Sequence, residues 1–290
     1  MLADDIPRFE FDGVQFGGLP TDILVEDWDT GQGEVRSQDA EPPGRAGLLV
    51  GRDFPAPPSW VFELVTNRDT VLDAMATVES LGGVWRSSRW SKPGVVGVLR
   101  YWVGDRARRV VGRPRRFSSP NGDVQGQRGA ARFMCDFQLT DPRSFDDNEG
   151  QVTLSLVPES TGGIIFPLVF PMTTTITGGV RAGFVTNDGD APAPVTVTFN
   201  GPVTNPKIFT DDWEIGITGK LAYDESVTVD CLAMTVKRQD GANVAGRLTR
   251  GTRLRNAALA PGQQEIKFTG ADSTGTATAV VSWRNSYWSI

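Results

Sequence analysis

The chain has 290 residues, of which 39% are hydrophobic and 22% charged, with a formal net charge of −6. It contains no histidine, which excludes Ser-His-Asp and Cys-His nucleophilic systems, most zinc sites and the commonest general base near neutral pH. We therefore expect no enzymatic activity, no metal and no cofactor. The 33 glycines and 19 prolines indicate a turn-rich protein built from short strands rather than long helices.

The sequence predicts neither a leader peptide nor a membrane span. The first residues, MLADDIPRFE, lack a basic and an apolar region, and the longest nonpolar run, GGIIFPLVFPM, is short and broken by proline. We expect no membrane insertion. Cys135 and Cys231 lie far apart in strand-like segments, and we expect both to be buried free thiols.

Charge is distributed unevenly along the first half of the chain. Residues 1–47 have a local net charge of −8, and residues 84–132 have a local net charge of +10 with several interleaved tryptophans. The arginine-rich segment could contact nucleic acid through phosphates and stacked bases. Alternatively, it could pair with the acidic segment of the same chain or of a neighbouring copy, because arginine is favoured at interfaces.

The N-terminal part is predicted to be a β-rich domain with one helix, covering residues 1–148. Segments such as FEFDGVQFGG and PSWVFELVT are typical of strands and turns, and NRDTVLDAMATVESLGG predicts an amphipathic helix. We expect Asn67 or Asp69 to cap this helix, the Gly82-Gly83 pair to end it, and a stripe to face the sheet that comprises Val71, Leu72, Met75 and Val78.

Three strands follow the helix in the predicted N-terminal domain. GVVGVLRYWVG and ARRVVGRPRRF are separated by Gly-Asp, which is a hairpin signal. RFMCDFQLTDP then alternates, with Phe133, Cys135, Phe137 and Leu139 on one face. The polar stretch RSFDDNEG begins the domain boundary, near residue 148.

Residues 149–177 are predicted to be a linker, because Pro167 and Pro171 forbid a regular central strand in GGIIFPLVFPM. Residues 178–290 show strand-like segments at short, regular spacing, separated by turn pairs such as Asp188-Gly189 and Asn200-Gly201. This cadence predicts a β-sandwich of the jelly-roll type. The fold class is therefore mainly β.

Two kinds of ligand chemistry stay open in the second half. Carboxylate groups such as Asp211, Asp212 and Glu214 could act as a glycosidase acid and base, although adjacent acids on a turn are usually solvated. Exposed tryptophans could stack on a sugar ring, and the candidates are Trp213, Trp283 and Trp288. The alternative for these rings is a place in the core or in a subunit contact.

Several motifs resemble the distal tail protein family of long-tailed siphophages, in particular those of actinobacterial hosts. The most specific are NGPVTNPKI, PGQQEIKF and VSWRNSYW in the second half, while FDGVQFGG, the Gly-rich loop GRAGLLVGRDF and ARFMCDFQLTDPRSF agree in the first half. The resemblance covers most of the chain. Residues 84–127 match least.

The resemblance implies a ring-forming N-terminal domain with one helix and a galectin-like C-terminal sandwich that projects outward. It implies a homohexameric ring in the virion tail tip, assembled in the host cytoplasm, which joins the tail tube protein to tip or baseplate proteins. DNA would pass through the channel without specific binding, and a host-surface glycan is a further expected partner. The main alternative is a carbohydrate-binding β-sandwich module.

Two sets of residues are predicted to form contacts. The first is a subunit interface between the acidic segment of one copy and four arginines of its neighbour, namely Arg108, Arg109, Arg115 and Arg116. The second is the apolar C-terminus, in which Trp283 shares the core face with Val281, while Tyr287, Trp288 and Ile290 fold back over the linker as a clamp.

Overall fold

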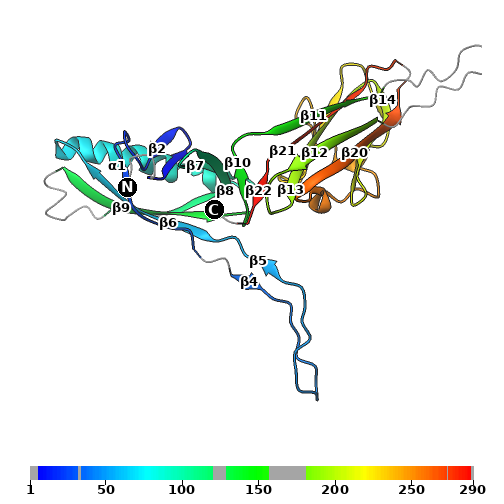
Figure 1. The fold of residues 1–290 in the computed structure, drawn as a ribbon. Helices are drawn as coiled ribbons and strands as arrows, with labels where there is room; N and C mark the ends of the chain where they lie inside the picture. The colour runs from blue at the N-terminus through cyan, green and yellow to red at the C-terminus, as the bar shows by residue number, and fades with distance from the viewer. Residues whose placement is uncertain (1–5, 32–33, 120–128, 157–180, 273, 289–290) are drawn as a thin grey trace, which may run out of the picture. The chain divides into compact units, whose positions relative to one another are not determined.

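The computed structural model describes residues 6–31, 34–119, 129–156, 181–272 and 274–288. Its internal contacts divide the chain into two units, one up to Asp147 with the C-terminal residues from Trp288, and one from Asn148 to Tyr287. Both units are mainly β, as predicted (Figure 1). Among the described residues, no helix has the length and apolar character needed to cross a membrane.

The N-terminal unit is built around one antiparallel sheet. Its strand order is β2-β1-β7-β8-β9-β6-β3, and β10 pairs with β8. The elements of this unit are β1 (Arg8–Phe11), β2 (Val14–Phe16), β3 (Leu24–Asp29), β4 (Val35–Arg36), β5 (Phe54–Pro55), β6 (Ser59–Asn67), α1 (Val71–Trp85), the 3-10 helix η2 (Ser88–Ser91), β7 (Gly97–Val103), β8 (Arg106–Ser118), β9 (Ala130–Leu139) and β10 (Ser144–Asp146).

Helix α1 lies along one face of this sheet (Figure 1). Strand β9 presents its predicted alternating residues to that face, and Phe133, Cys135, Phe137 and Leu139 are all buried. The helix is fixed there by Trp85, whose Nε1 donates a hydrogen bond to the backbone oxygen of Asp136 at 3.1 Å. The alternation predicted from the sequence is therefore confirmed for this strand.

The predicted buried stripe of α1 is wrong in phase. Val71, Leu72 and Met75 are exposed, and the buried positions are Ala74, Val78, Leu81, Gly82 and Trp85. Ala74, Val78, Leu81 and Trp85 also have the spacing of one helix face. The first of them is a small alanine, which makes this face less conspicuous in the sequence. Sequence periodicity alone therefore matched two overlapping stripes, and packing against the sheet selected the one that ends in tryptophan.

The predicted boundaries of α1 also need correction. Thr70 caps the helix, and its Oγ1 accepts a hydrogen bond from the backbone nitrogen of Asp73 at 3.2 Å. The helix continues through Gly82 and Gly83. A Cβ at Gly82 would lie 3.2 Å from the Phe117 ring, so this glycine permits close packing of the helix and does not end it.

The C-terminal unit is a β-sandwich of two antiparallel sheets. One sheet has the order β11-β21-β13-β17-β18 with β19 on β13, and the other has the order β12-β20-β14-β15 with β16 on β14. The elements of this unit are β11 (Gly150–Ser155), β12 (Arg181–Asn187), β13 (Ala193–Asn200), β14 (Val203–Phe209), β15 (Glu214–Gly216), β16 (Lys220–Leu221), β17 (Ser226–Asp230), β18 (Thr235–Arg238), the 3-10 helices η4 (Ala245–Arg247) and η5 (Leu254–Asn256), β19 (Ala258–Leu259), β20 (Gly262–Ala271), β21 (Thr278–Trp283) and β22 (Ser286–Tyr287).

Strand β13 shows how the sandwich core forms. Ala193, Val195, Val197 and Phe199 are fully buried, and the residues between them are partly exposed. Because side chains alternate between the two faces of a strand, this pattern gives each sheet one apolar face. The two apolar faces share a single core cluster of mainly aliphatic side chains, with valine the most frequent.

The linker predicted for residues 149–177 is wrong at its beginning. Gly150–Ser155 forms β11, which pairs with β21 over its whole length. Val152 and Leu154 pack in the sandwich core, whereas the residues that suggested a linker, Pro167 and Pro171, lie further along the chain. The remainder, residues 157–177, lies outside the described residues.

Candidate functional site

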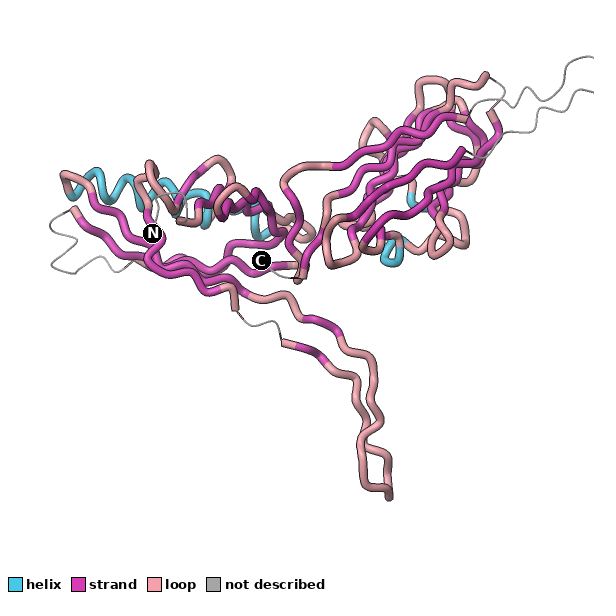
Figure 2. Tube along the Cα trace, viewed as in Figure 1, coloured by secondary structure: helices cyan, strands magenta, loops and turns pink. Residues whose placement is uncertain are grey.

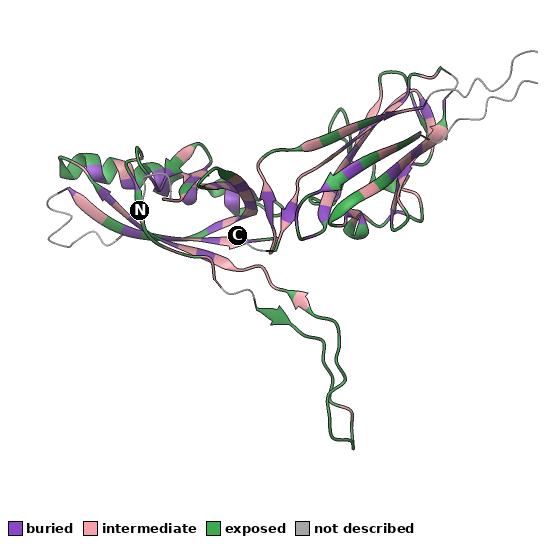
Figure 3. Cartoon of the chain, in the orientation of Figure 1, coloured by how far each residue is buried: buried purple, intermediate pink, exposed green. Residues whose placement is uncertain are grey.

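An extended two-stranded arm leaves the sheet of the N-terminal unit (Figure 2). Strands β4 and β5 pair at its base, and Ala40 and Leu49 form a further bridge with backbone hydrogen bonds of 2.9 and 3.0 Å. Gly51 donates to the Asp39 carboxylate at 2.7 Å. Nearly all side chains from residue 34 to residue 53 are exposed (Figure 3), so little besides this ladder holds the arm in place.

The arm carries apolar side chains that the described residues leave uncovered. Leu48, Leu49 and Val50 are consecutive and are 55%, 59% and 83% exposed, and Val35 is 59% exposed. An isolated two-stranded ribbon is at best marginally stable in water, and clustered exposed apolar side chains mark interaction sites. This surface is suited to docking on another protein.

Sequence reasoning missed the arm as a functional element. The stretch GRAGLLVGRDF was interpreted only as a Gly-rich loop. The available signal was the apolar run Leu48-Leu49-Val50 between glycines, because consecutive apolar residues in a polar loop require cover.

Two of the four predicted interface arginines are engaged within the N-terminal unit. Arg109 forms an ion pair with Asp147, and its Nε lies 2.8 Å from the carboxylate. Arg108 is only 8% exposed. Arg115 and Arg116 are exposed at a register shift between β8 and β9, so these two are the members of the set that a neighbouring copy could reach.

The acidic and arginine-rich segments pair within one chain at several points. Arg100 lies 3.2 Å from Glu10, Arg132 lies 2.7 Å from Glu26, and Arg89 forms an ion pair with Asp12. Of the two pairing modes left open by the sequence, the intrachain one is present in the structure. These pairs are partly exposed, and such pairs contribute little net stability.

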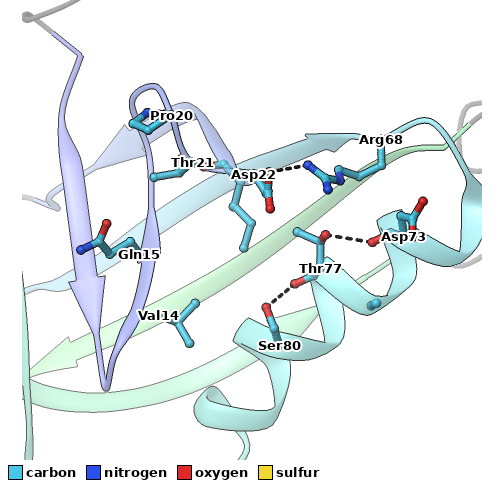
Figure 4. Close-up of a pocket in the computed structure, with 11 residues that line it drawn as sticks. Val14, Gln15, Pro20, Thr21, Asp22, Arg68, Asp73, Thr77 and Ser80 are labelled. Carbon is cyan, nitrogen blue, oxygen red and sulfur yellow. Dashed lines mark hydrogen bonds and ion pairs between the residues drawn. The ribbon is translucent and has the colours of Figure 1, made fainter.

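A cavity of about 520 Å³ lies between β2, the loop before β3 and helix α1 (Figure 4). Asp22 forms an ion pair with Arg68 at its rim, and Thr77 and Ser80 donate to backbone oxygens of their own helix. The second carboxylate of the lining, Asp73, accepts a hydrogen bond from the Oγ1 of Thr70 at 2.7 Å. Both carboxylates are thus engaged, and the rest of the lining mixes polar side chains with apolar ones such as Val14 and Ile23.

The carboxylates of the sandwich do not form a metal site. Among the described residues, no group of three or more Asp, Glu, Cys or His side chains is placed to hold a metal ion. Glu214 forms an ion pair with Lys207, so it does not act together with the neighbouring Asp211 and Asp212. The prediction that the protein is not an enzyme stays a prediction.

The tryptophans proposed for sugar stacking have different environments. Trp213 is 7% exposed and belongs to the sandwich core. Trp283 packs against that core beside the buried Val281, and its Nε1 donates to the backbone oxygen of Thr186 at 2.9 Å. Trp288 is 50% exposed. Of the three, Trp288 is thus the ring that is exposed in the described chain.

The predicted clamp over the linker cannot be traced to its contacts. Tyr287 lies in β22, and Trp288 groups with the N-terminal unit. Ile290 and residues 157–177 lie outside the described residues. The clamp therefore stays a prediction.

Comparisons with known proteins give a result for structure and none for sequence. No family model matches the chain, and no curated protein matches it. The Dit protein of phage SPP1, whose crystal structure is described as a paradigm of the hub adsorption apparatus in phages that infect Gram-positive bacteria, is similar with a TM-score of 0.62 and 13% identity over 97% of this chain and 98% of that one.

Two structures of the phage P2 baseplate in its activated conformation, with calcium and with strontium, also contain a similar chain. Their TM-scores are 0.54 and 0.52, each at 10% identity over 95% of this chain and 97% of that chain. Such low identity establishes fold and not activity. The expected β-rich fold is thus confirmed, and nearly the whole chain is similar in fold to the SPP1 Dit protein.

Proposed function

We propose that this protein is a structural hub of the tail tip of a long-tailed bacteriophage. The observation that carries the proposal is the similarity of fold to the SPP1 Dit protein over 97% of this chain. Because the match extends over both units, it does not rest on one common sandwich alone. Fold alone does not determine function, so the exposed arm provides the second support.

The arm favours assembly of several copies into a ring. Its uncovered side chains Leu48, Leu49 and Val50 need a partner surface, and docking on a different surface of the next copy would make the contact heterologous. Heterologous contacts close into rings when the rotation between copies allows it. The sequence resemblance implies six copies, and Arg115 and Arg116 would add electrostatic alignment between neighbours.

In this role the ring joins the tail tube protein to tip or baseplate proteins in the virion, after assembly in the host cytoplasm. The N-terminal domain forms the ring around a channel through which DNA passes, and the C-terminal sandwich projects outward. The protein would act through subunit contacts and not through catalysis. A host glycan would be a separate partner of the sandwich.

Mass photometry of the purified chain tests the ring. The wild-type protein should form particles of about six chain masses. The triple variant Leu48→Ser, Leu49→Ser and Val50→Ser should remain a single chain, because each substitution removes apolar area from the contact. Its circular dichroism spectrum should be unchanged, since these side chains are exposed and do not hold the fold of the single chain.

A matched control removes exposed apolar area elsewhere. Phe184 and Tyr223 of the sandwich are 67% and 72% exposed, and the double variant Phe184→Ser and Tyr223→Ser should still form rings. A wild-type protein that remains a single chain at every concentration would contradict the ring. A triple variant that assembles normally would contradict the role of the arm.

A further inference from the structure

Helix α1 carries apolar side chains outside the face that packs on the sheet, and the described part of the chain leaves them largely exposed. Leu72 and Met75 are 77% and 52% exposed. Leu19, in the loop between β2 and β3, is 67% exposed. Apart from the arm, these are the three most exposed large hydrophobic side chains described in the N-terminal unit. Exposed apolar side chains that gather in one place mark an interaction site.

The leucines of this set stand beside the cavity between α1, β2 and the loop before β3 (Figure 4). Leu72 comes directly before Asp73 and one turn before Ala76, both of which line the cavity. Leu19 comes directly before the lining residue Pro20. The cavity, of about 520 Å³, is therefore a groove between a helical wall and a loop wall, and each wall has an exposed leucine beside it.

The arm is apolar on both of its sides. Leu49 forms an antiparallel bridge with Ala40, so the chain is extended at this point. Successive side chains of an extended chain point to opposite sides, which places Leu49 opposite Leu48 and Val50. All three are more than half exposed. A flat surface would cover one side of this ribbon, whereas a groove with two walls can cover both.

The arm lies far from the groove of its own chain. Figure 1 shows that it leaves the sheet on the side opposite to α1 and extends away from the sheet. Residues 34–53 give about ten residues on each side of the ribbon, which at about 3.3 Å per residue reach roughly 30 Å. Each copy thus offers one arm and one groove that cannot satisfy each other, and a closed ring of copies would use all of them.

The charges beside the two apolar surfaces are opposite in sign. The nearest charged residues before and after the apolar run of the arm are Arg45 and Arg52, both exposed. Residues 69–80 of the helical wall contain no base and three exposed acids, namely Asp69, Asp73 and Glu79. Complementary charges at the edge of a contact align the partners and speed their association. They favour the arm of another copy as the occupant of the groove.

We propose that the groove between α1 and the β2–β3 loop binds the arm of a neighbouring copy, with Leu48, Leu49 and Val50 held between its two walls. This inference rests on the ring of the proposed function and names the surface that receives the arm.

Substitutions in the helical wall test the proposal. The double variant Leu72→Ser and Met75→Ser removes exposed apolar area from the groove. It should remain a single chain in sedimentation velocity at concentrations at which the wild type forms rings. Its circular dichroism spectrum should be unchanged, since both side chains lie outside the packed face of α1. The control variant Val96→Ser and Val98→Ser changes exposed valines that do not line the groove and should still form rings.

A mixture of two defective variants tests whether the two surfaces meet. The helix variant keeps an intact arm, and the arm variant Leu48→Ser, Leu49→Ser and Val50→Ser keeps an intact groove. Their mixture should form pairs of chains and nothing larger, because only one intact contact can form. A wild type that never assembles would contradict the hub itself. If the wild type forms rings, then rings of the helix variant, or a mixture without pairs or with larger particles, would overturn the groove alone.

Charge reversal tests the alignment of arm and helix. Arg45→Glu with Arg52→Glu should raise the concentration needed for half-assembly at least about fivefold. Adding Asp69→Arg and Glu79→Arg should restore assembly, because the signs are then complementary again. Reversal of the opposite charge on the same arm, Glu41→Arg, is the control and should not raise this concentration. Reversed arms that the reversed helix does not rescue would show that these charges do not face each other, contrary to the proposal.

Discussion

The two units of this protein bury different kinds of side chain. The N-terminal core is aromatic, and its largest fully buried residues include Trp60, Trp85, Tyr101 and Phe62. The C-terminal core is formed mainly by aliphatic side chains, above all valine, from the two facing sheets. Among the described residues, the ring pair Phe199–Phe268 is the single aromatic contact in the sandwich.

The two units also differ in how their exposed apolar side chains are placed. The sandwich exposes separate ones, such as Phe184 and Tyr223, outside the core that its two sheets share. The N-terminal unit packs its aromatic rings on one side of its sheet, yet it also extends an arm with exposed Leu48, Leu49 and Val50. We infer that assembly concerns the N-terminal unit.

The largest expected effect concerns the two thiols, since each unit contains one. Cys135 and Cys231 are buried free thiols, as predicted. Burial raises the pKa of Cys231 to about 12 and raises the pKa of Cys135 well above its usual value. Because the thiolate is the reactive form, labelling by a disulfide reagent at pH 8 should be at least about a thousandfold slower in the native protein than in guanidinium.

Single-cysteine variants assign each labelling rate to its unit. With Cys231→Ala, the reagent reports opening of the N-terminal unit, and with Cys135→Ala it reports opening of the sandwich. Since both folded pKa values are raised, each thiol lowers stability as pH increases past its unfolded value of about 9. Identical labelling profiles in increasing guanidinium would show that the units unfold together.

Removing a matched phenylalanine from each core tests the comparison of packing. Phe62 and Phe199 are both fully buried, and Phe62→Ala and Phe199→Ala should each cost about 3–5 kcal/mol of unfolding free energy. Phe62 contacts the rings of Phe9, Phe16 and Trp60 at 5.0, 5.5 and 6.4 Å. Its removal should therefore cost about 1 kcal/mol more, measured by urea denaturation. Equal costs would show that the extra ring contacts add nothing.

A smaller loss is expected from the buried amide that joins two loops of the sandwich. Asn187 donates to the backbone oxygens of Ala191 and Leu259 at 2.8 and 3.1 Å, and it accepts from the nitrogens of Gly189 and Ser286 at 3.1 and 3.4 Å. Asn187→Ala leaves these groups without a partner and should destabilise the C-terminal unit by about 3 kcal/mol.

Asn200 provides the matched comparison for this amide. It is partly buried and donates a single side-chain hydrogen bond, to Thr278 at 3.1 Å. Asn200→Ala should cost about 1 kcal/mol, measured by thermal unfolding of the same unit. If Asn187→Ala lowered the unfolding free energy by no more than Asn200→Ala, the buried amide would not be a major source of stability in the sandwich.

The smallest effect is a pH dependence confined to the sandwich. Burial of Asp272 acts to raise its pKa, but hydrogen bonds from the backbone nitrogen of Ala277 and from Thr274 outweigh it, so the pKa lies below its usual 3.8. The resulting stability is present above the unfolded pKa and lost as pH falls through the folded value.

Melting of the sandwich as a function of pH measures this contribution. Asp272→Asn should lower stability by about 1 kcal/mol at pH 7 and should flatten the acid-induced loss below about pH 4. The exposed Asp224→Asn variant serves as the control. A pH profile that is the same for Asp272→Asn and for the wild type would contradict the role of this carboxylate.

Much of the fold could be predicted because strand alternation and turn chemistry are local. Phe133 to Leu139 in β9 and the Gly104-Asp105 turn between β7 and β8 were identified from neighbouring residues alone. The phase of α1 could not be, since Val71, Leu72 and Met75 compete with Ala74 and Leu81 for the same period. Only the shape of the sheet decides between the two stripes.

The site residues depended more strongly on long-range contacts. The charge of Arg109 suggested a neighbouring copy, but Asp147 neutralises it from 38 residues away. Likewise, the loop around Thr252 reaches β15 through a hydrogen bond from the Gly216 nitrogen, 36 residues away in the sequence. Sequence separation of this kind leaves no periodic signal, so these contacts were not predicted.

Strand β11 has a consequence for how the sandwich is joined to the rest of the chain. Gly150 at its start lies opposite Trp283 at the end of β21, so the chain enters and leaves this unit on adjacent strands. A domain whose two ends lie close together can be exchanged for another, or replaced by a short peptide, without changing the path of the chain in the N-terminal unit. Related chains could therefore vary the sandwich while keeping the N-terminal unit.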